Sequence, residues 1–282
     1  MYSAKIIKDS INTSGDRITT FELTYPRCVH AEFMTHRLFS RNAASSRAIP
    51  IEKMIEAVKK TPMMFKWWGK NQKGMSAKEE LTGRALERAK EEWLLTRDLV
   101  VAQAIRLSEI GLHKQNVNRI LEPFAFITVI LTATEYENWY FLRDDPEAQP
   151  EIAWLAGEMR KCHEASTPKE LGAGEWHLPY IELEDTSSPL YCDHTALGGD
   201  ISLLVKIATA RCARVSYLTH NGKRDYDKDL ERHDRCRDKR HWSSFEHCAK
   251  ADDDSSRHGN FVGWRQYRKT FKNEHAGRIL PT

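Results

Sequence analysis

The feature that most restricts the fold of this chain is an alternation of apolar and polar residues near its N-terminal end. Phe21, Leu23 and Tyr25 alternate with polar side chains, which is the period-2 pattern of a strand with one buried face. Residues 2–11 carry isoleucines that suit a second strand, and the turn-forming residues of 12–16 separate the two stretches. A proline directly after Tyr25 ends the pattern. The sequence therefore predicts an N-terminal β-hairpin.

Helical patterns follow the hairpin. We expect one helix over residues 51–60 and a second, longer helix that ends at Gly111, because glycine is a common C-terminal signal. Ser76 is the predicted N-cap of the longer helix. Glu79 follows three residues later, as in a capping box.

Later segments complete the expected secondary structure. The strongly apolar stretch 116–142 predicts one or two buried helices that are interrupted near Pro123. A short helix is expected over 152–163. Residues 165–200 are rich in proline and glycine and are expected to form a linker or an excursion from the domain, and 201–217 begins as a helix.

The overall composition argues against some classes of function but does not indicate a particular one. The chain has 282 residues, enough for one large domain or two small ones, and its 43 basic and 40 acidic residues leave a net charge of only +3. This balance gives no reason to expect nucleic-acid or membrane binding. No apolar run approaches the roughly 18 residues of a membrane-spanning helix. Six scattered cysteines without a CxxC motif suit free thiols, so we expect a cytoplasmic protein.

The densest chemical signal is the segment 35–47. It holds three arginines, three serines, one histidine and one asparagine, and it contains no acidic residue. Guanidinium groups and hydroxyls in this combination are suited to bind a phosphate or pyrophosphate. A solvated basic loop would have the same composition, so composition alone leaves both interpretations open.

The order of residues in this segment resembles the signature of flavin-dependent thymidylate synthases. The residues at matching offsets are His36, Arg37, Ser40, Asn42, Ser45 and Arg47. The upstream context also matches, because Pro26 ends a predicted strand nine positions before Thr35, the first position of the signature.

Two further stretches resemble the same family. Residues 143–152 match a motif of arginine, four spacers, Ala-Gln, one spacer and Glu-Ile, and Arg119 with Pro123 matches an arginine that opens an apolar segment. Asn138 aligns, with a shorter spacing, with a flavin-contacting position. The resemblance implies that Arg143 contacts the pyrimidine ring, where a guanidinium would stabilise negative charge as C5 becomes nucleophilic.

A fourth similarity has an unexpected place in the chain. Residues 213–217 and 241–247 resemble two family motifs that normally precede the basic signature, whereas here they follow it. We interpret this as a circular permutation of a single domain spanning residues 1–282, a rearrangement that domains with neighbouring termini tolerate. A faint repeat of the signature at 265–274 leaves a partial duplication open.

The resemblance implies an α+β fold, in which a twisted, largely antiparallel sheet packs with helices, and a homotetramer with shared sites. It also implies FAD, NADPH and 5,10-methylenetetrahydrofolate, with a one-carbon unit transferred to C5 of a pyrimidine deoxynucleoside monophosphate such as dUMP. The residues implied to bind FAD are Thr35, His36, Arg37, Ser40, Asn138 and Ser243. The residues implied to bind the nucleotide are Glu32, Ser45, Ser46, Arg47, Arg119 and Arg143, with Arg143 catalytic.

The chain departs from the family pattern at four positions. Thr35 stands for an arginine, Ala43 for an acidic residue, Glu32 for a glutamine and Ser244 for a proline. A carboxylate at Glu32 can only accept hydrogen bonds, so cytosine is conceivable as the base in place of uracil. A hydroxymethyl product and a non-catalytic flavin- or nucleotide-binding descendant remain alternatives.

Other chemistries have weaker support in the sequence. Histidines and cysteines gather between residues 233 and 248, but their spacing fits no regular zinc motif. The tail places Trp264 and Tyr267 among basic residues, which suits a solvated face better than a nucleic-acid surface. Cys212 and Cys248 have charged neighbours but no recognised arrangement for nucleophilic catalysis.

Overall fold

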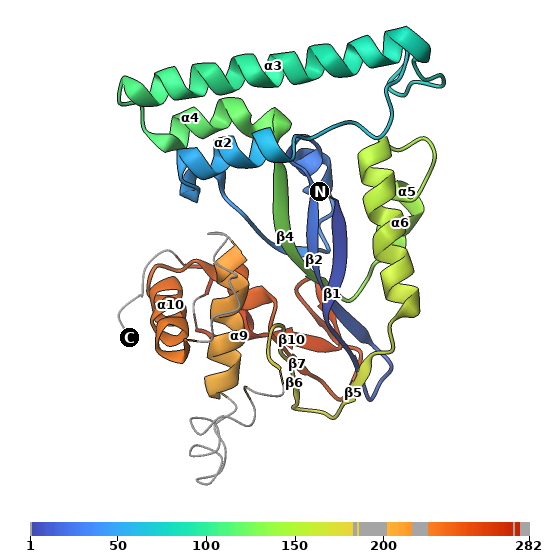
Figure 1. The fold of residues 1–282 in the computed structure, drawn as a ribbon. Coiled ribbons are helices and arrows are strands. Elements are labelled where there is room, and N and C mark those ends of the chain that lie inside the picture. Colours follow the sequence, from blue (N-terminus) through green and yellow to red (C-terminus); the bar gives the residue numbers. More distant parts are fainter. Residues whose placement is uncertain (1, 183–184, 186–201, 216–224, 273, 277–282) are drawn as a thin grey trace.

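The computed structural model describes residues 2–182, 185, 202–215, 225–272 and 274–276. A five-stranded sheet in the order β3-β4-β2-β1-β5 is central to the fold (Figure 1). Every neighbouring pair is antiparallel except β1 and β5, which are parallel. The strands are β1 (Ser3–Asn12), β2 (Arg17–Pro26), β3 (Ser40–Ala43), β4 (Phe126–Ala133) and β5 (Lys169–Leu171). The predicted N-terminal hairpin is confirmed by the pairing of β1 with β2.

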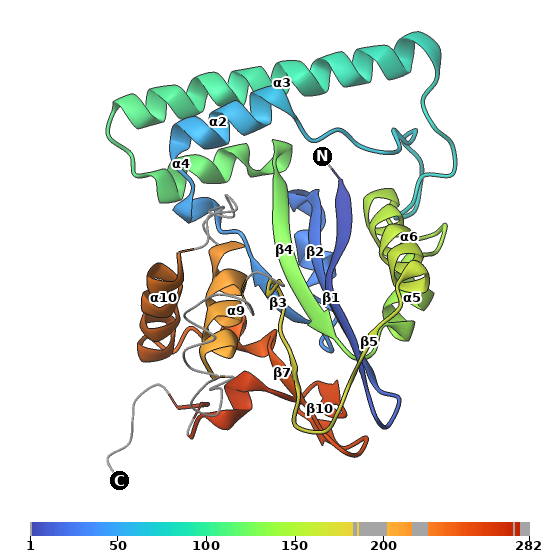
Figure 2. The same cartoon turned by 60° about the horizontal axis from the view of Figure 1, so that its bottom comes forward.

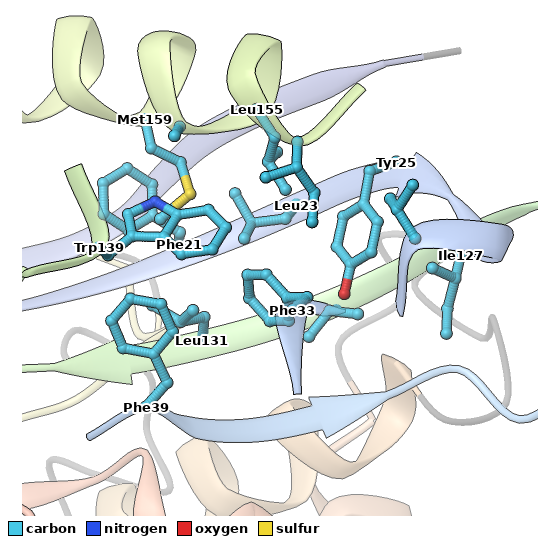
Figure 3. Packing of buried hydrophobic residues seen from close by; sticks show 14 of the residues in the cluster. Phe21, Leu23, Tyr25, Phe33, Phe39, Ile127, Leu131, Trp139, Leu155 and Met159 are labelled. Atoms are coloured by element: carbon cyan, nitrogen blue, oxygen red, sulfur yellow. The ribbon is translucent and has the colours of Figure 1, made fainter. Parts of the chain in front are cut away.

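One face of this sheet carries the main hydrophobic core. Phe21, Leu23 and Tyr25 are fully buried on this face of β2, as their alternation predicts, and Leu131 of β4 lies beside them. Side chains of α6, including Met159, cover the same face (Figure 3). The helices on this side are α1 (His30–Phe33), α5 (Glu137–Arg143) and α6 (Pro150–Ala165). Burial of large apolar side chains, each contributing roughly 1.5–3 kcal/mol, therefore fixes where α1 and α5 lie.

A layer of three helices lies at one end of the sheet (Figure 1). They are α2 (Ile51–Lys60), α3 (Gly83–Glu109) and α4 (Lys114–Leu121). The predicted bounds of α2 are confirmed. The predicted start of the long helix near Ser76 is wrong, because Thr82 is its N-cap. The Ser76 hydroxyl instead donates to the carbonyl of Glu147 at 3.0 Å, and Glu79 forms an ion pair with Lys70 at 2.8 Å.

The prediction of helices throughout 116–142 is also wrong in part. The stretch contains α4, a 3-10 turn η3 (Glu122–Phe124), strand β4 and helix α5. β4 is the strand between β3 and β2, and most of its side chains are buried on both faces. A strand that is buried on both faces shows no alternation, so its sequence reads as a continuous apolar run like that of a buried helix. The predicted helix at 152–163 is confirmed as α6.

The C-terminal part of the chain lies against the opposite face of the sheet. Helices α9 and α10 pack together on that side, while α5 and α6 lie on the other (Figure 2). Its helical elements are α9 (Ser202–Arg214), α10 (Tyr226–Asp238), η5 (Trp242–Glu246) and η6 (Tyr267–Thr270). A three-stranded sheet in the order β10-β7-β6 and a two-stranded sheet accompany them. Their strands are β6 (Trp176–His177), β7 (Ala249–Ala251), β8 (Arg257–His258), β9 (Phe261–Val262) and β10 (Trp264–Gln266).

These elements bear on the remaining expectations from the sequence. The architecture is mixed α and β and is compatible with the predicted α+β class. Within the predicted excursion 165–200, the described residues form β5 and β6, and the rest lies outside the described part of the chain, as do residues 216, 217 and 273 of the family-like motifs. The predicted helix from 201 is confirmed as α9. The five described cysteines are free thiols, and none of the described helices is long and apolar enough to cross a membrane.

Candidate functional site

The end of α5 and the turn after α1 bring two of the predicted site residues into contact. The Nε of Arg143 donates to Nε2 of His36 at 3.0 Å, and its Nη2 lies 3.5 Å from the Thr35 hydroxyl. Positions 107 residues apart in the sequence therefore meet. Because an arginine can only donate, the Nε2 atom of His36 must be the acceptor, which places the imidazole proton on Nδ1.

Aromatic packing and burial keep His36 neutral and fixed. Its ring meets that of Trp139 at 4.6 Å between centroids and at 90°, an edge-to-face arrangement. Burial, with smaller contributions from the guanidinium groups of Arg143 and Arg41, lowers the pKa of His36 to about 4. Arg41 also donates to the backbone carbonyl of His36 at 3.0 Å. The imidazole is thus a neutral acceptor that orients the guanidinium of Arg143.

Glu32 contributes an unsatisfied acceptor on α1. Its backbone carbonyl accepts from the Thr35 hydroxyl at 2.7 Å. Its Oε2 atom is buried, and within the described part of the chain it has no hydrogen-bond partner. An orphaned carboxylate oxygen is costly unless a donor reaches it, so Glu32 retains the capacity to accept a hydrogen bond from a ligand.

A second group of predicted residues gathers around Glu122. Its carboxylate accepts from the Ser46 hydroxyl at 2.6 Å and from Nη1 of Arg119 at 2.9 Å, and it pairs with Nε of Arg27 at 3.0 Å. Arg47 is exposed nearby in η2 (Ser46–Ala48). The carboxylate of Glu122 already engages both arginines and offsets one of their two positive charges, so a phosphate bound here would compete with it for them. Ser45 lies immediately before η2, as its N-cap.

A third contact joins the basic segment to the C-terminal motif. The hydroxyl of Ser243 in η5 donates to Oδ1 of Asn42 in β3 at 3.1 Å, across 201 positions of sequence. Ser40, also in β3, is 2% exposed and accepts from Nε2 of Gln266 at 2.9 Å and from Nδ2 of Asn260 at 3.0 Å. Its lone pairs are therefore used within the protein, and only its own proton remains for a flavin.

Two predicted residues are exposed near these groups, and several participants were not predicted. Arg37 is exposed on the turn after α1, and Asn138 is exposed on α5. Trp139 and Glu122 are not among the site residues predicted from the sequence. The spacing of Glu122 three residues after Arg119 was a usable signal, since such a pair meets on one helix face. Nothing in the local sequence indicates that Trp139 packs against His36.

Two features elsewhere in the described structure bear on other kinds of site. No group of three or more metal-ligating side chains occurs among the described residues. A groove of ≈ 620 Å³ lies between α2 and α3, and it is lined by Glu52, Ile55, Glu56, Lys59, Lys60 and Ile105. None of the residues predicted to bind flavin or nucleotide lines it.

No family model matches the chain, and no curated protein matches it. Among solved structures, the chain is similar to the crystal structure of a UMP/dUMP methylase, PolB, from Streptomyces cacaoi bound with 5-Br UMP. The two chains are 13% identical, the match covers 58% of this chain and 88% of that one, and the TM-score is 0.46. Likeness at this level establishes neither a family nor an activity for this chain.

Proposed function

We propose that this protein is an FAD-dependent enzyme that transfers a one-carbon unit from 5,10-methylenetetrahydrofolate to C5 of a pyrimidine deoxynucleoside monophosphate. NADPH would reduce the flavin, and dUMP would be converted to dTMP. The proposal rests on the four sequence motifs and on the way in which three of them meet in space. A homotetramer with sites shared between subunits belongs to the same proposal.

The observation that carries the proposal is the convergence of distant motifs on one segment. The basic segment contacts Arg143 of the second motif through His36, and it contacts Ser243 of the C-terminal motif through Asn42. The resemblance assigns these stretches to one site independently of the contacts between them. A rearranged chain order still allows the motifs to come together, which supports a permuted domain.

The described residues fit a flavin in part. Arg37 and Asn138 are exposed and could face a bound isoalloxazine or its pyrophosphate, and the exposed Ser243 would have only the lone pairs of its hydroxyl to offer, because its proton goes to Asn42. Ser40 fits less well, because its hydroxyl already accepts two hydrogen bonds from side-chain amides. When bound, the reduced flavin would supply the hydride that completes the methyl group.

The roles of the protein side chains follow from their donors and acceptors. Arg143 would donate to the carbonyl oxygens of the base and stabilise negative charge on the ring as C5 attacks. His36 would hold the guanidinium in place by accepting from its Nε. The orphaned Oε2 of Glu32 would accept from a donor on the base or sugar. Arg119 and Arg47 would meet the phosphate, in competition with Glu122.

Flavin content and nucleotide binding test the proposal together. The purified protein, supplemented with FAD, should show the visible bands of oxidised flavin, and a pyrimidine deoxynucleotide should shift them. In Arg143→Ala the flavin should remain bound while the nucleotide-dependent shift is lost. Arg88→Ala, on the exposed side of α3, is the matched control and should behave as wild type. A protein that takes up no FAD would refute the flavin mechanism.

One observation favours a second candidate substrate. Uracil and cytosine differ at C4, where uracil has a carbonyl and cytosine has an amine that can donate to a carboxylate. Because the free oxygen of Glu32 can only accept, it is suited to the cytosine amine. Parallel titration with dUMP and dCMP distinguishes the two, and Glu32→Gln should shift the preference toward dUMP. A hydroxymethyl product would be recognised by mass spectrometry of the nucleotide formed.

A non-catalytic descendant is the alternative from another functional class. Thr35 and Ala43 lack the charges of the family pattern, and their loss would be expected to weaken contacts near the flavin. Flavin binding without NADPH-dependent product formation, with either nucleotide, would favour this alternative.

A further inference from the structure

A continuous chain of side-chain hydrogen bonds crosses the buried face of the five-stranded sheet that the main core does not occupy. His177 of β6 contacts the Ser10 hydroxyl through Nδ1 at 3.0 Å and the Thr20 hydroxyl through Nε2 at 2.8 Å. Thr20 and Thr132 are paired in register on β2 and β4, and their hydroxyls are 2.7 Å apart. The Thr132 hydroxyl then contacts Nδ1 of His247 at 2.9 Å. All five residues are fully buried.

The proton count of this chain allows only two arrangements. Each hydroxyl has one proton to donate, and each neutral imidazole has one. Burial lowers the pKa of both His177 and His247 to about 3, so both rings are neutral at physiological pH. A threonine hydroxyl could accept from both of its neighbours, but the proton of Thr20 or Thr132 would then meet no acceptor that the described residues provide, which is costly in a buried place. The four bonds and these two protons are satisfied together only if all of the bonds point the same way. Both histidines must then carry their proton on the same ring atom, either Nε2 or Nδ1.

The chain reaches an unsatisfied group at its far end. His247 is 0% exposed, and its Nε2 has no hydrogen-bond partner among the described residues. The hydroxyl of Ser244 is 2% exposed and is likewise without a partner in this part of the structure. Ser244 lies in η5 and His247 is its C-cap, with helical dihedral angles, so these two side chains, three residues apart, point to the same side of the turn. Two orphaned polar atoms on one side of one turn are a costly arrangement in a dry interior.

We propose that Ser244 and His247 form a buried water-binding site that terminates a directional hydrogen-bond relay from Ser10 to η5. A water molecule has both donors and acceptors, and buried water typically satisfies such groups. Whichever way the relay points, a water at Nε2 of His247 completes it, either as acceptor or as donor. The remaining hydrogen-bonding capacity of this water is then available to the Ser244 hydroxyl. The site belongs to the fold and does not depend on the flavin or nucleotide proposal.

The relay has a structural consequence for the candidate site. It ties β6 and η5, which belong to the C-terminal part of the fold, to β1, β2 and β4 of the central sheet. η5 also carries Ser243, whose hydroxyl contacts Asn42. Ser244 and His247 therefore act as positioning residues for Ser243, and the bound water sets the orientation of the turn that presents it.

Two measurements on the wild-type protein test the proposal directly. Two-bond ¹⁵N–¹H NMR spectra report which ring nitrogen carries the proton, and His177 and His247 should show the same tautomer. A high-resolution crystal structure should show one ordered water within hydrogen-bond distance of both Nε2 of His247 and Oγ of Ser244. Opposite tautomers, or a well-ordered turn without this water, would overturn the proposal.

Matched variants separate the relay from general packing effects. Thr132→Val breaks the chain at its centre, so the tautomer of His247 should no longer follow that of His177. Thr128→Val is the control, because Thr128 forms an equivalent hydroxyl pair with Thr24 at 3.2 Å on the same two strands but outside the relay. Its histidine signals should match wild type. If Thr132→Val does not fold, the wild-type tautomers and the water density still decide the question, and identical effects of the two variants would count against the relay.

Discussion

At the scale of single residues, the contact between His36 and Arg143 is the most consequential detail of the candidate site. An arginine side chain is long and has many rotamers, so its position is definite only where acceptors hold it. Here a neutral imidazole accepts from Nε and leaves other N–H groups of the guanidinium for a ligand. The sequence assigned both residues to one site. It did not indicate that one would hold the other, because that depends on how α1 and α5 pack.

Substitutions at His36 test this role. His36→Leu removes the acceptor, and nucleotide affinity should fall about tenfold, or ~1.4 kcal/mol, which is typical of a lost hydrogen bond to a charged group. His36→Gln offers a side-chain carbonyl to Nε of Arg143 and should retain most of the affinity. Calorimetric titration of the FAD-loaded protein measures both. An equal loss in the two variants would indicate that the ring serves only as packing against Trp139.

At the scale of elements, amphipathic segments were predicted well and segments buried on all sides were not. The β1–β2 hairpin, α2 and α6 each keep one face on the core, so their periodicity is visible in the sequence. β4 lies inside the sheet with most side chains buried on both faces, and the period-2 signal disappears. The start of α3 was misplaced for a different reason. Ser76 and Glu79 have the residue types of a capping box, but tertiary partners engage both side chains.

Gly263 lies where two elements of the fold come into close contact. It has a φ of +69°, and a Cβ there would overlap the side chains of Asn12 and Asp16 in the β1–β2 turn. The side-chain amide of Asn12 also donates to the carbonyl of Gly263 at 3.0 Å. Gly263, between β9 and β10, therefore lies so close to the N-terminal hairpin that a side chain at this position would force Asn12 and Asp16 to move.

Gly263→Ala should therefore lower the free energy of unfolding by about 2–4 kcal/mol, from backbone strain and steric overlap together. Gly15→Ala is the matched control, with a φ of +87° but no atom within 4 Å of the added carbon, and it should cost only about 1 kcal/mol. Urea denaturation followed by tryptophan fluorescence measures both. Equal losses would show that strain alone matters and that the close approach of the two segments does not.

At the scale of the whole molecule, the motifs follow an unusual order in the sequence, but they lie close together in the structure. The basic segment, Arg143 and Ser243 come from three distant parts of the chain and are linked by direct contacts. The resemblance to the family predicts that these three parts of the chain belong to one site. It could not show that Ser40 and Ser46 would have their hydroxyls engaged by neighbouring side chains, because those partners lie far away in sequence.

Buried neutral histidines give the whole molecule a marked sensitivity to acid. In five histidines burial is the largest cause that lowers the pKa, which falls to about 4 or about 3 from about 6.5 in an unfolded chain. The residues are His30, His36, His163, His177 and His247. Between these values the unfolded chain binds more protons than the folded one, so stability rises with pH in this window. It is fully present above about pH 6.5 and is lost as the pH falls toward 3.

Each of the five histidines contributes a slope of about 1.4 kcal/mol per pH unit within its window, and the windows of the two relay histidines extend furthest, to about pH 3. Urea denaturation at a series of pH values from 7 to about 4.5 would give the slope for the wild type. His247→Gln should reduce it by about one proton, and the exposed His241→Gln serves as the control. An unchanged slope in His247→Gln would mean that this imidazole does not stay neutral in the folded protein, and a protonated His247 would need an anionic partner that the relay does not supply.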